Sequence, residues 1–248
     1  MINKNPDNRS AMEVYYLHHS GVAVKLDGAL LVFDYWKHRE DGNLSEGYIH
    51  EDELKAASRV YVFVSHVHED HFNPVVFEWA KTRPVTYILD EGIPDAPEGA
   101  VRLARGEEFR DDFLNVRAFG STDIGVSFFV HCAGAYGGVG LFHAGDLNCW
   151  HWQDDGDAHY AQVMRAWFDR ELRFLKHCAP RIDYAFFPLD KRMGSGYEEG
   201  PDKFIEAMKP GVLVPIHFVD FGDTQDYAAR RQDGETRVLP VFMPGRLI

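Results

Sequence analysis

The chain has 248 residues and a formal net charge of −13 at pH 7, with 45% hydrophobic and 26% charged residues. This length and composition are typical of one large globular domain. The acidic charge opposes binding to a nucleic-acid backbone, which requires clustered lysines and arginines. No apolar run is long enough to cross a membrane. From the charge we expect no nucleic-acid partner, and from the apolar runs we expect no membrane partner.

The cysteines and the N-terminal residues predict a cytoplasmic protein. Cys132, Cys149 and Cys178 cannot all pair with one another, and none of them belongs to a CxxC motif. Residues 1–10 (MINKNPDNRS) are polar and contain no apolar signal core. We expect residues 1–11 to form a loose tail and residues 1–248 to form a single domain.

Short apolar runs predict that strands dominate the N-terminal part of the chain. Asp27-Gly28, between two of these runs, is typical of a hairpin turn. The expected strands are residues 14–17, 22–26, 30–33 and 60–64, with a short helix at residues 51–57.

The rest of the chain is expected to mix strands and helices. Asn73 and Pro74 suit the N-cap and the first position of a helix over residues 74–81. Apolar residues recur at helical spacing over residues 157–177, which predicts a long amphipathic helix. The further strands expected are residues 85–89, 113–119, 126–130, 139–142, 182–187 and 212–216, with a further helix at residues 201–208.

The apolar run at residues 60–64 (VYVFV) predicts a fully buried strand, and a cluster of histidines and acids follows it directly. His66 and His68 would project to the same side of an extended segment, where two imidazoles can hold one ion. Asp70 and His71 come after the chain begins to turn, so they can reach a second ion. Imidazole together with carboxylate suits zinc, iron or manganese.

The motif His66-x-His68-x-Asp70-His71 after an apolar strand resembles the signature of the metallo-β-lactamase superfamily. The opening strands resemble its branch similar to ascorbate-6-phosphate lactonase. The segments GSTDIGVSF and GDLNCWHW resemble an uncharacterised bacterial subgroup of its hydrolases, and the resemblance covers nearly the whole chain. It implies an α/β fold, a four-layer αββα sandwich of two mixed β-sheets, with the metal site at one edge.

The resemblance also implies roles for residues outside the first motif. Asp146 follows an apolar run and matches the carboxylate that bridges two metals, and His217 matches the last metal ligand. Asp34 matches an acid that orients the histidine loop through hydrogen bonds, although it could equally begin a plain turn. His19 is a weaker candidate for the same orienting role.

One histidine of the superfamily pattern is missing. Its place reads Gly120-Ser121-Thr122-Asp123, and the next histidine, His131, lies at the far end of the following strand. Asp123 could replace it as a ligand, directly or through water, or Ser121 or Thr122 could face a site completed by water. Alternatively, the first metal binds weakly and only the second remains. We favour Asp123, because carboxylate is a sound ligand for zinc, manganese or iron.

Two residues are candidates for catalytic work. Asp70 would orient the attacking water or act as its base, besides binding metal. His151 lies between Trp150 and Trp152, close to Asp146 in sequence, and could donate a proton or contact the substrate. We expect Trp152 to line a pocket and Trp150 to cover the following helix as a hydrophobic plug.

These features predict a metal-dependent hydrolase that uses a metal-activated water on a small ester, lactone or phosphoester metabolite. One or two divalent ions are expected, with zinc favoured over manganese and iron. The alternative is a non-catalytic metal-binding or ligand-sensing module with a degenerate first metal site. The expected partner is a small-molecule substrate, and the sequence carries no signal for the oligomeric state.

Overall fold

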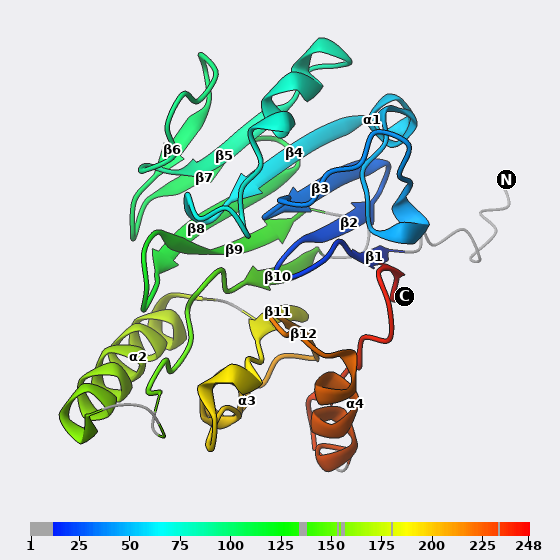
Figure 1. Cartoon of the computed structure of the whole chain (residues 1–248). Coiled ribbons are helices and arrows are strands. Elements are labelled where there is room, and N and C mark those ends of the chain that lie inside the picture. The colour runs from blue at the N-terminus through cyan, green and yellow to red at the C-terminus, as the bar shows by residue number, and fades with distance from the viewer. Residues whose placement is uncertain (1–11, 134–137, 153, 155–156, 180, 233) are drawn as a thin grey trace, which may run out of the picture.

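The computed structural model describes residues 12–133, 138–152, 154, 157–179, 181–232 and 234–248. The expected tail, residues 1–11, lies outside the described residues. In the described part of the chain, two mixed β-sheets of seven strands each lie face to face (Figure 1).

The first sheet contains the N-terminal strands. Its members are β1 (Glu13–Tyr16), β2 (Val22–Leu26), β3 (Ala29–Phe33), β4 (Arg59–Val64), β5 (Thr86–Asp90), β6 (Val101–Leu103) and β14 (Gly245–Arg246). Their order is β14-β1-β2-β3-β4-β5-β6. The pairs from β14 to β3 are antiparallel, and those from β3 to β6 are parallel.

The second sheet is formed by the middle and C-terminal parts of the chain. Its members are β7 (Glu108–Arg110), β8 (Leu114–Gly120), β9 (Val126–Cys132), β10 (Val139–His143), β11 (Tyr184–Pro188), β12 (Val212–Ile216) and β13 (Arg237–Val238). They follow one another in space as β13-β12-β11-β10-β9-β8-β7. The strands β7 to β10 pair antiparallel, whereas β10 to β13 pair in parallel.

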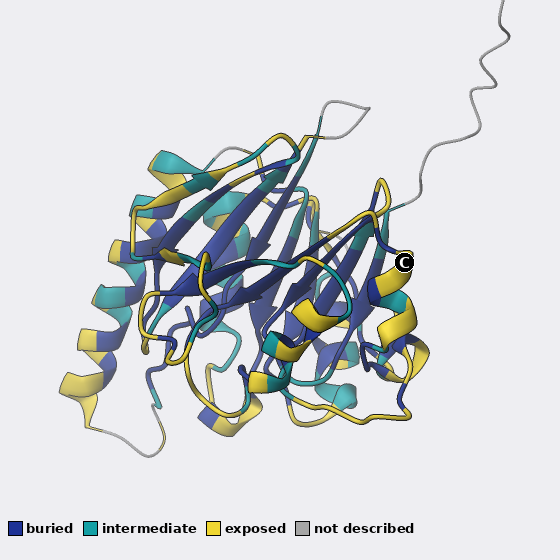
Figure 2. Ribbon diagram, turned by 90° about the horizontal axis from the view of Figure 1, so that it is seen from above, coloured by how far each residue is buried: buried dark blue, intermediate teal, exposed yellow. Residues whose placement is uncertain are grey.

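Helices cover the outer faces of both sheets, as Figures 1 and 2 show. The α-helices are α1 (Glu51–Ala56), α2 (Ala158–Cys178), α3 (Glu199–Met208) and α4 (Phe221–Arg230). Three further segments are 3-10 helices: η1 (Leu44–Glu46), η2 (Pro74–Lys81) and η3 (Lys191–Met193). The sides of the helices that face the strands are buried, and their other sides are exposed (Figure 2).

Three apolar layers hold the four structural layers together. The central layer lies between the sheets, and a second packs α1 and η2 on the first sheet. A third packs α2, α3 and α4 on the second sheet. The expected four-layer αββα sandwich of two mixed sheets is therefore confirmed.

Strand β4 is apolar at successive positions because both of its faces are buried. Tyr61 and Phe63 point into the central layer, whereas Val60, Val62 and Val64 point into the layer beneath α1 and η2. Side chains alternate between the two faces of a strand, and here both faces are covered. The strand is thereby fixed in the middle of the sheet, and it carries the histidine motif at its C-terminal end.

The expected strands and helices are present, with shifts of one or two residues at most ends. Two details differ. Residues 74–81 form a 3-10 helix rather than an α-helix, consistent with the weak α preference of the β-branched Val75 and Val76. Sequence patterns also missed helix α4 and four strands, β6, β7, β13 and β14. These strands have only two or three residues each, which is too few for a periodic signal.

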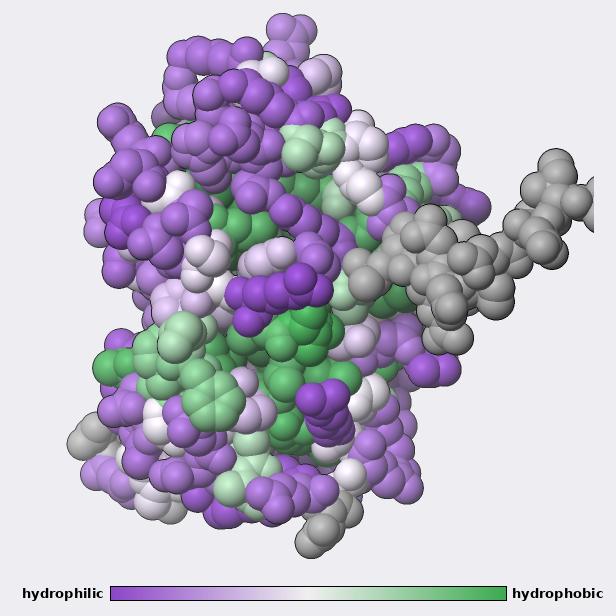
Figure 3. Space-filling model, turned by 90° about the vertical axis from the view of Figure 1, so that its right-hand side faces the viewer, coloured by the Kyte–Doolittle hydropathy of each residue, from purple (hydrophilic) through white to green (hydrophobic). Residues whose placement is uncertain are grey.

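The outer surface is mostly hydrophilic on the face shown in Figure 3, with a hydrophobic area across its middle. No helix within the described residues is long and apolar enough to cross a bilayer.

The central layer generates a test of the sandwich. Phe63 is fully buried, and its ring centroid lies 4.4 Å from that of Phe33 and 5.5 Å from that of Phe128 on the facing sheet. We expect Phe63→Ala to lower the free energy of unfolding by about 3–5 kcal/mol, measured by urea denaturation. Val163→Ala, at a position that is 46% exposed on α2, should change it by less than about 0.5 kcal/mol. Equal effects of the two substitutions would contradict this packing.

Candidate metal centre

The C-terminal ends of several strands bring acidic and histidine side chains to one edge of the sandwich. In the first sheet, β1, β3 and β4 run in the same direction, and in the second so do β8, β10, β11 and β12. Ligands of α/β proteins commonly bind at such ends. The residues that follow these strands are His19, Asp34, the motif at residues 66–71, Asp123, Asp146, Asp190 and His217.

A first group consists of His66, His68, Asp123 and Asp146. One nitrogen or carboxylate oxygen of each lies within 4.8 Å of those of the other three. The His68 Nδ1 atom is 3.1 Å from His66 Nε2 and 3.6 Å from the Asp123 carboxylate. This group is therefore compact enough to hold a single ion. It contains Asp123 where the superfamily pattern has a histidine.

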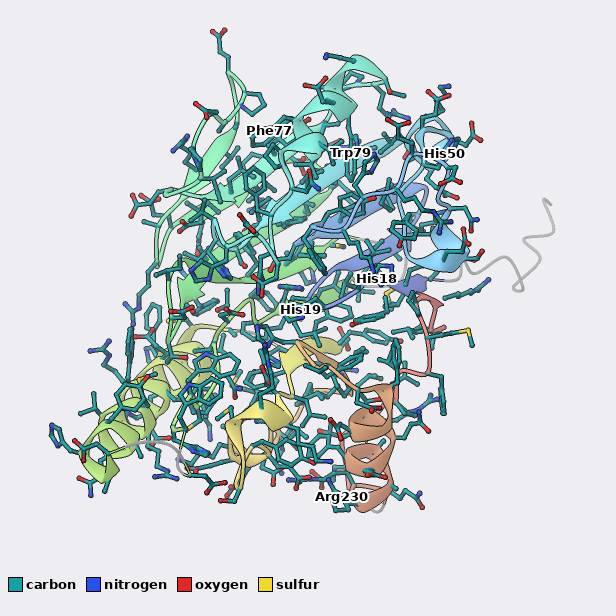
Figure 4. All side chains as sticks on the ribbon, viewed as in Figure 1. His18, His19, His50, Phe77, Trp79 and Arg230 are labelled. Atoms are coloured by element: carbon teal, nitrogen blue, oxygen red, sulfur yellow. The ribbon has the colours of Figure 1, made fainter. Side chains whose placement is uncertain are left out.

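A second group consists of His19, Asp70, His71 and His217, within the same 4.8 Å limit. His19 Nε2 lies 3.3 Å from an Asp70 carboxylate oxygen, and the His19 and His217 ring centroids are 4.1 Å apart. Figure 4 shows His19 near the centre of the molecule, whereas His50 lies at the periphery. His19 thus lies among the potential ligands, closer than its expected orienting role requires.

Asp146 connects the two groups. Its Oδ1 atom lies 3.0 Å from His71 Nε2 and 3.4 Å from His217 Nε2. Its Oδ2 atom lies 3.4 Å from His66 Nε2 in the first group. One carboxylate oxygen therefore faces each group, which is the placement that a bridging ligand needs.

Polar atoms at the centre of the second group lack hydrogen bonds. His19 Nε2, His71 Nε2 and Asp146 Oδ1 are buried and have no hydrogen-bond partner among the described residues. Buried polar atoms are rarely left unsatisfied because this costs free energy. Imidazole nitrogens and carboxylate oxygens are also ligands for zinc and other transition metals. The donor set of these residues therefore fits a divalent metal ion.

Asp34 holds the histidine loop in place. Its buried carboxylate accepts hydrogen bonds from the Ser65 backbone N–H at 2.8 Å and from the Ser65 hydroxyl at 2.6 Å. It also lies 2.8 Å from His71 Nδ1, so that His71 Nε2 is directed towards Asp146. The structure thus places Asp34 in contact with the loop that it was expected to orient.

Asp190 and His217 form a matching pair on the second sheet. Asp190 is buried, and its carboxylate lies 3.0 Å from His217 Nδ1. This contact directs His217 Nε2 towards Asp146. A carboxylate that fixes the far nitrogen of a histidine in this way is common around protein metal sites.

The acids and histidines strongly perturb one another. Burial alone would lower the pKa of His71, but the nearby carboxylates of Asp146 and Asp34 raise it to about 10. Burial and the neighbouring His71 lower the pKa of His66 to about 4. Burial and the charge of Asp146 raise the pKa of Asp123. The carboxylates therefore favour positive charge among them, which a metal ion would also supply.

Gly125 allows the turn after Asp123 to approach the histidine loop. Its φ angle is +76°, and a Cβ atom at this position would lie 2.1 Å from the Ser65 carbonyl oxygen. The Val126 backbone N–H donates to this same oxygen at 2.9 Å. A side chain at position 125 would therefore separate Asp123 from the other members of the first group.

A cavity of about 270 Å³ opens beside the two groups. Asp123, Asp146 and His217 line it from the metal side, and Trp150 and Trp152 form an apolar wall. The expected pocket position of Trp152 agrees with this cavity, whereas Trp150 lines it too instead of only covering the following helix. Its other described lining residues are Thr122, Tyr160, Met164, Asp190 and Arg192.

His151 does not reach this cavity. Its ring is fully buried, and Nε2 lies 3.0 Å from the Gly196 carbonyl oxygen and 3.7 Å from Glu199. The described residues that line the cavity do not include His151. The alternation of Trp150, His151 and Trp152 suggested one shared wall. In the structure only the two tryptophans share it, so this position does not support a proton donor.

Sequence reasoning gave His19 only a weak orienting role, and it assigned no role at the site to Asp190 or Arg192. Their only local signal is that His19 and Asp190 closely follow strands, and many residues in proteins do so. Arg192 lines the cavity because its guanidinium group pairs with Asp190, within 2.5 Å. Such a pair is visible only once the positions of both residues are known.

No family model matches the sequence, and no curated protein matches it either. Solved structures do match it. Igni18, described as a metallo hydrolase of the archaeon Ignicoccus hospitalis, is 20% identical, with a TM-score of 0.62 over 95% of this chain and 97% of Igni18. YhfI of Bacillus subtilis, described as a metallo-β-lactamase fold protein, is 10% identical, with a TM-score of 0.55 over 95% of this chain and 98% of YhfI.

The chain has the metallo-β-lactamase fold. A third similar structure is CmlA, a diiron β-hydroxylase of Streptomyces venezuelae, at 11% identity and a TM-score of 0.62. The similarity covers 95% of this chain but 54% of CmlA. At such low sequence identity, the similarity supports the fold alone. The expected resemblance to the branch similar to ascorbate-6-phosphate lactonase stays a prediction.

The contacts of Asp34 generate a test of how the metallo-β-lactamase fold supports the metal centre. We expect Asp34→Asn to weaken zinc binding by about 10–100-fold, because the amide cannot accept from both Ser65 and His71 as the carboxylate does. Zinc affinity would be measured by competition with a chelator, and circular dichroism would verify folding. Asp41→Asn, whose side chain is 88% exposed, is the matched control. Unchanged zinc affinity in folded Asp34→Asn would refute this role.

Proposed function

We propose that this protein is a metal-dependent hydrolase that acts on a small ester, lactone or phosphoester. The observation that carries the proposal is the pair of groups, four histidine and acidic side chains in each, with the Asp146 carboxylate between them. Similarity to solved structures supports it, since Igni18, which shares the fold, is described as a metallo hydrolase.

His66, His68, Asp123 and Asp146 would hold one ion, and His19, Asp70, His71 and His217 would hold a second together with Asp146. A divalent ion lowers the pKa of a bound water towards about 7 and polarises a carbonyl or phosphoryl oxygen. His19 is included because its buried Nε2 atom makes no hydrogen bond among the described residues, lies 3.3 Å from an Asp70 carboxylate oxygen, and belongs to a ring close to that of His217.

The protein's own groups would orient the reactants. Asp70 is 46% exposed, so it can contact solvent and serve as the base for an attacking water, besides binding metal. Asp34 and Asp190 keep His71 and His217 directed towards Asp146. Trp150 donates its indole N–H to the Asp146 backbone oxygen at 2.8 Å, so the apolar wall and the bridging acid are held together.

The cavity supports a small-molecule substrate. Its volume of about 270 Å³ lies close to the lower end of the range for small-molecule sites, and its tryptophans offer an apolar contact beside the polar metal edge. The net charge of −13 remains unfavourable for nucleic acid as a partner. All three cysteines are free, in keeping with the proposed cytoplasmic location.

Zinc is the ion that we propose, since histidine and carboxylate ligands suit it. The carboxylates of Asp70, Asp123 and Asp146 also suit manganese and iron, so the ion is to be identified by measurement. The competing proposal is a non-catalytic metal-binding or ligand-sensing module, which Asp123 in place of the usual histidine would favour.

Metal content and turnover test the proposal together. We expect about two ions per chain by elemental mass spectrometry, and hydrolysis of at least one member of a panel of aryl esters, lactones and phosphoesters. Asp146→Ala should lose metal and reduce turnover by more than about 100-fold, because both groups share this carboxylate. Asp226→Ala, an exposed position on α4, should retain both properties.

The variants Asp123→Ala and His19→Ala separate the two groups. Each should lose about one ion per chain, because each removes a side chain from only one group. Bound metal without turnover of any panel member would favour the non-catalytic module. Retained turnover in Asp146→Ala would overturn the proposed mechanism.

A further inference from the structure

A second cavity, of about 540 Å³, shares the lining residue Asp123 with the cavity beside the metal groups. Because Asp123 belongs to the first metal group, both cavities border that group. The second cavity is formed by the end of β8, the loop between β6 and β7, and helix α2. Its described lining residues are Arg105, Gly120, Ser121, Asp123, Gly125, Trp167, Arg170 and Glu171.

A buried acid holds two arginines at this cavity. The Glu171 side chain is only 2% exposed, and its carboxylate accepts from Arg105 Nε at 2.8 Å and pairs with Arg170 Nη2 at 3.2 Å. The arginine side chains are 46% and 65% exposed, so they face solvent while their positions are fixed by the acid. Arg105 also lies over the Phe174 ring, 4.1 Å from its centroid.

Gly120 leaves room for the Glu171 carboxylate because it has no side chain. A Cβ atom on Gly120 would lie 2.6 Å from a Glu171 carboxylate oxygen, so only glycine permits the approach without movement. Gly120 ends β8 and precedes the segment that carries Asp123. Gly120, which lies against the anchor of the two arginines, is therefore separated by only two residues from Asp123 of the first metal group.

Charge distinguishes the second cavity from the first. In the first, Arg192 pairs with the buried Asp190, and the two charges cancel. In the second, two arginines share one carboxylate, which leaves one positive charge. Asp123 offsets that charge unless the Asp123 carboxylate is bound to a cation. Guanidinium groups bind phosphate and carboxylate through charge-assisted hydrogen bonds.

We propose that the Arg105–Glu171–Arg170 cavity binds a phosphate or carboxylate group of the substrate, while the bond to be hydrolysed lies beyond Asp123 at the metal groups. Trp167 lines the same cavity and offers an apolar contact to the body of such a molecule. The substrate is accordingly an anionic ester, lactone or phosphoester with a second acidic group. This inference rests on the proposed hydrolase function.

The test follows the side-chain Nε–H signals of Arg105 and Arg170 by NMR in the zinc-loaded full-length protein. Inorganic phosphate and acetate are titrated separately, which distinguishes phosphate from carboxylate recognition. We expect saturable shifts of both signals with at least one of these anions. Arg170→Ala should raise the dissociation constant of that anion by about tenfold, as followed through Arg105. Arg173→Ala, an exposed arginine of the same helix outside the cavity, should leave it within about twofold.

Glu171→Gln tests the charge directly. It removes the acid that offsets the arginines, so the anion should bind more tightly, whereas a purely structural role for the cluster predicts no tightening. No saturable shift in the parent protein, or equal effects of Arg170→Ala and Arg173→Ala, would overturn the inference. Metal content and hydrolysis of an uncharged ester are measured on the same samples. If the parent protein binds no metal and hydrolyses no ester, the hydrolase proposal is refuted. If it does both but the arginine signals show no saturable shift, only this inference is refuted.

Discussion

The buried carboxylate of Asp34 is the contact on which the arrangement of the metal edge depends. It joins the end of β3 to the loop after β4 by accepting hydrogen bonds from Ser65 and facing the His71 ring. A buried carboxylate is tolerated only when such donors satisfy it. The loop conformation and the charge of Asp34 therefore support each other. Asp34 also adopts a left-handed backbone with φ of 45°, which turns the chain away from the sheet and its side chain into the loop.

Asp146 then links this loop to the second sheet. It faces His71 and His66 from the first sheet and His217 from the second, so one carboxylate lies where the two halves of the sandwich meet. The central apolar layer keeps the sheets in register, but the residues at the edge are mutually close acids and imidazoles. Buried atoms here that make no hydrogen bond among the described residues, such as His71 Nε2 and Asp146 Oδ1, would be satisfied by a bound cation.

The two sheets contribute differently to the site. The first sheet supplies most of the histidines, in segments that directly follow strands buried on both faces. The second sheet and helix α2 supply the walls of both cavities, including the tryptophans and the arginine cluster. Rigid strands thus position the potential ligands, whereas loops and one exposed helix set which molecules can approach. Variation of α2 could change substrate selection without disturbing the histidine loop.

Local apolar runs in the sequence predicted most strands, because such runs report burial, and the resemblance of the histidine motif to the metallo-β-lactamase superfamily implied the layered α/β fold. It also brought Asp34, Asp123, Asp146 and His217 into consideration, since each follows a recognisable strand. Only the tertiary structure decided that His19 joins Asp70, that His151 turns away to Gly196, and that Glu171 anchors two arginines. These contacts join residues far apart in the chain, and their distances depend on how two sheets pack. No local spacing in the sequence encodes that packing.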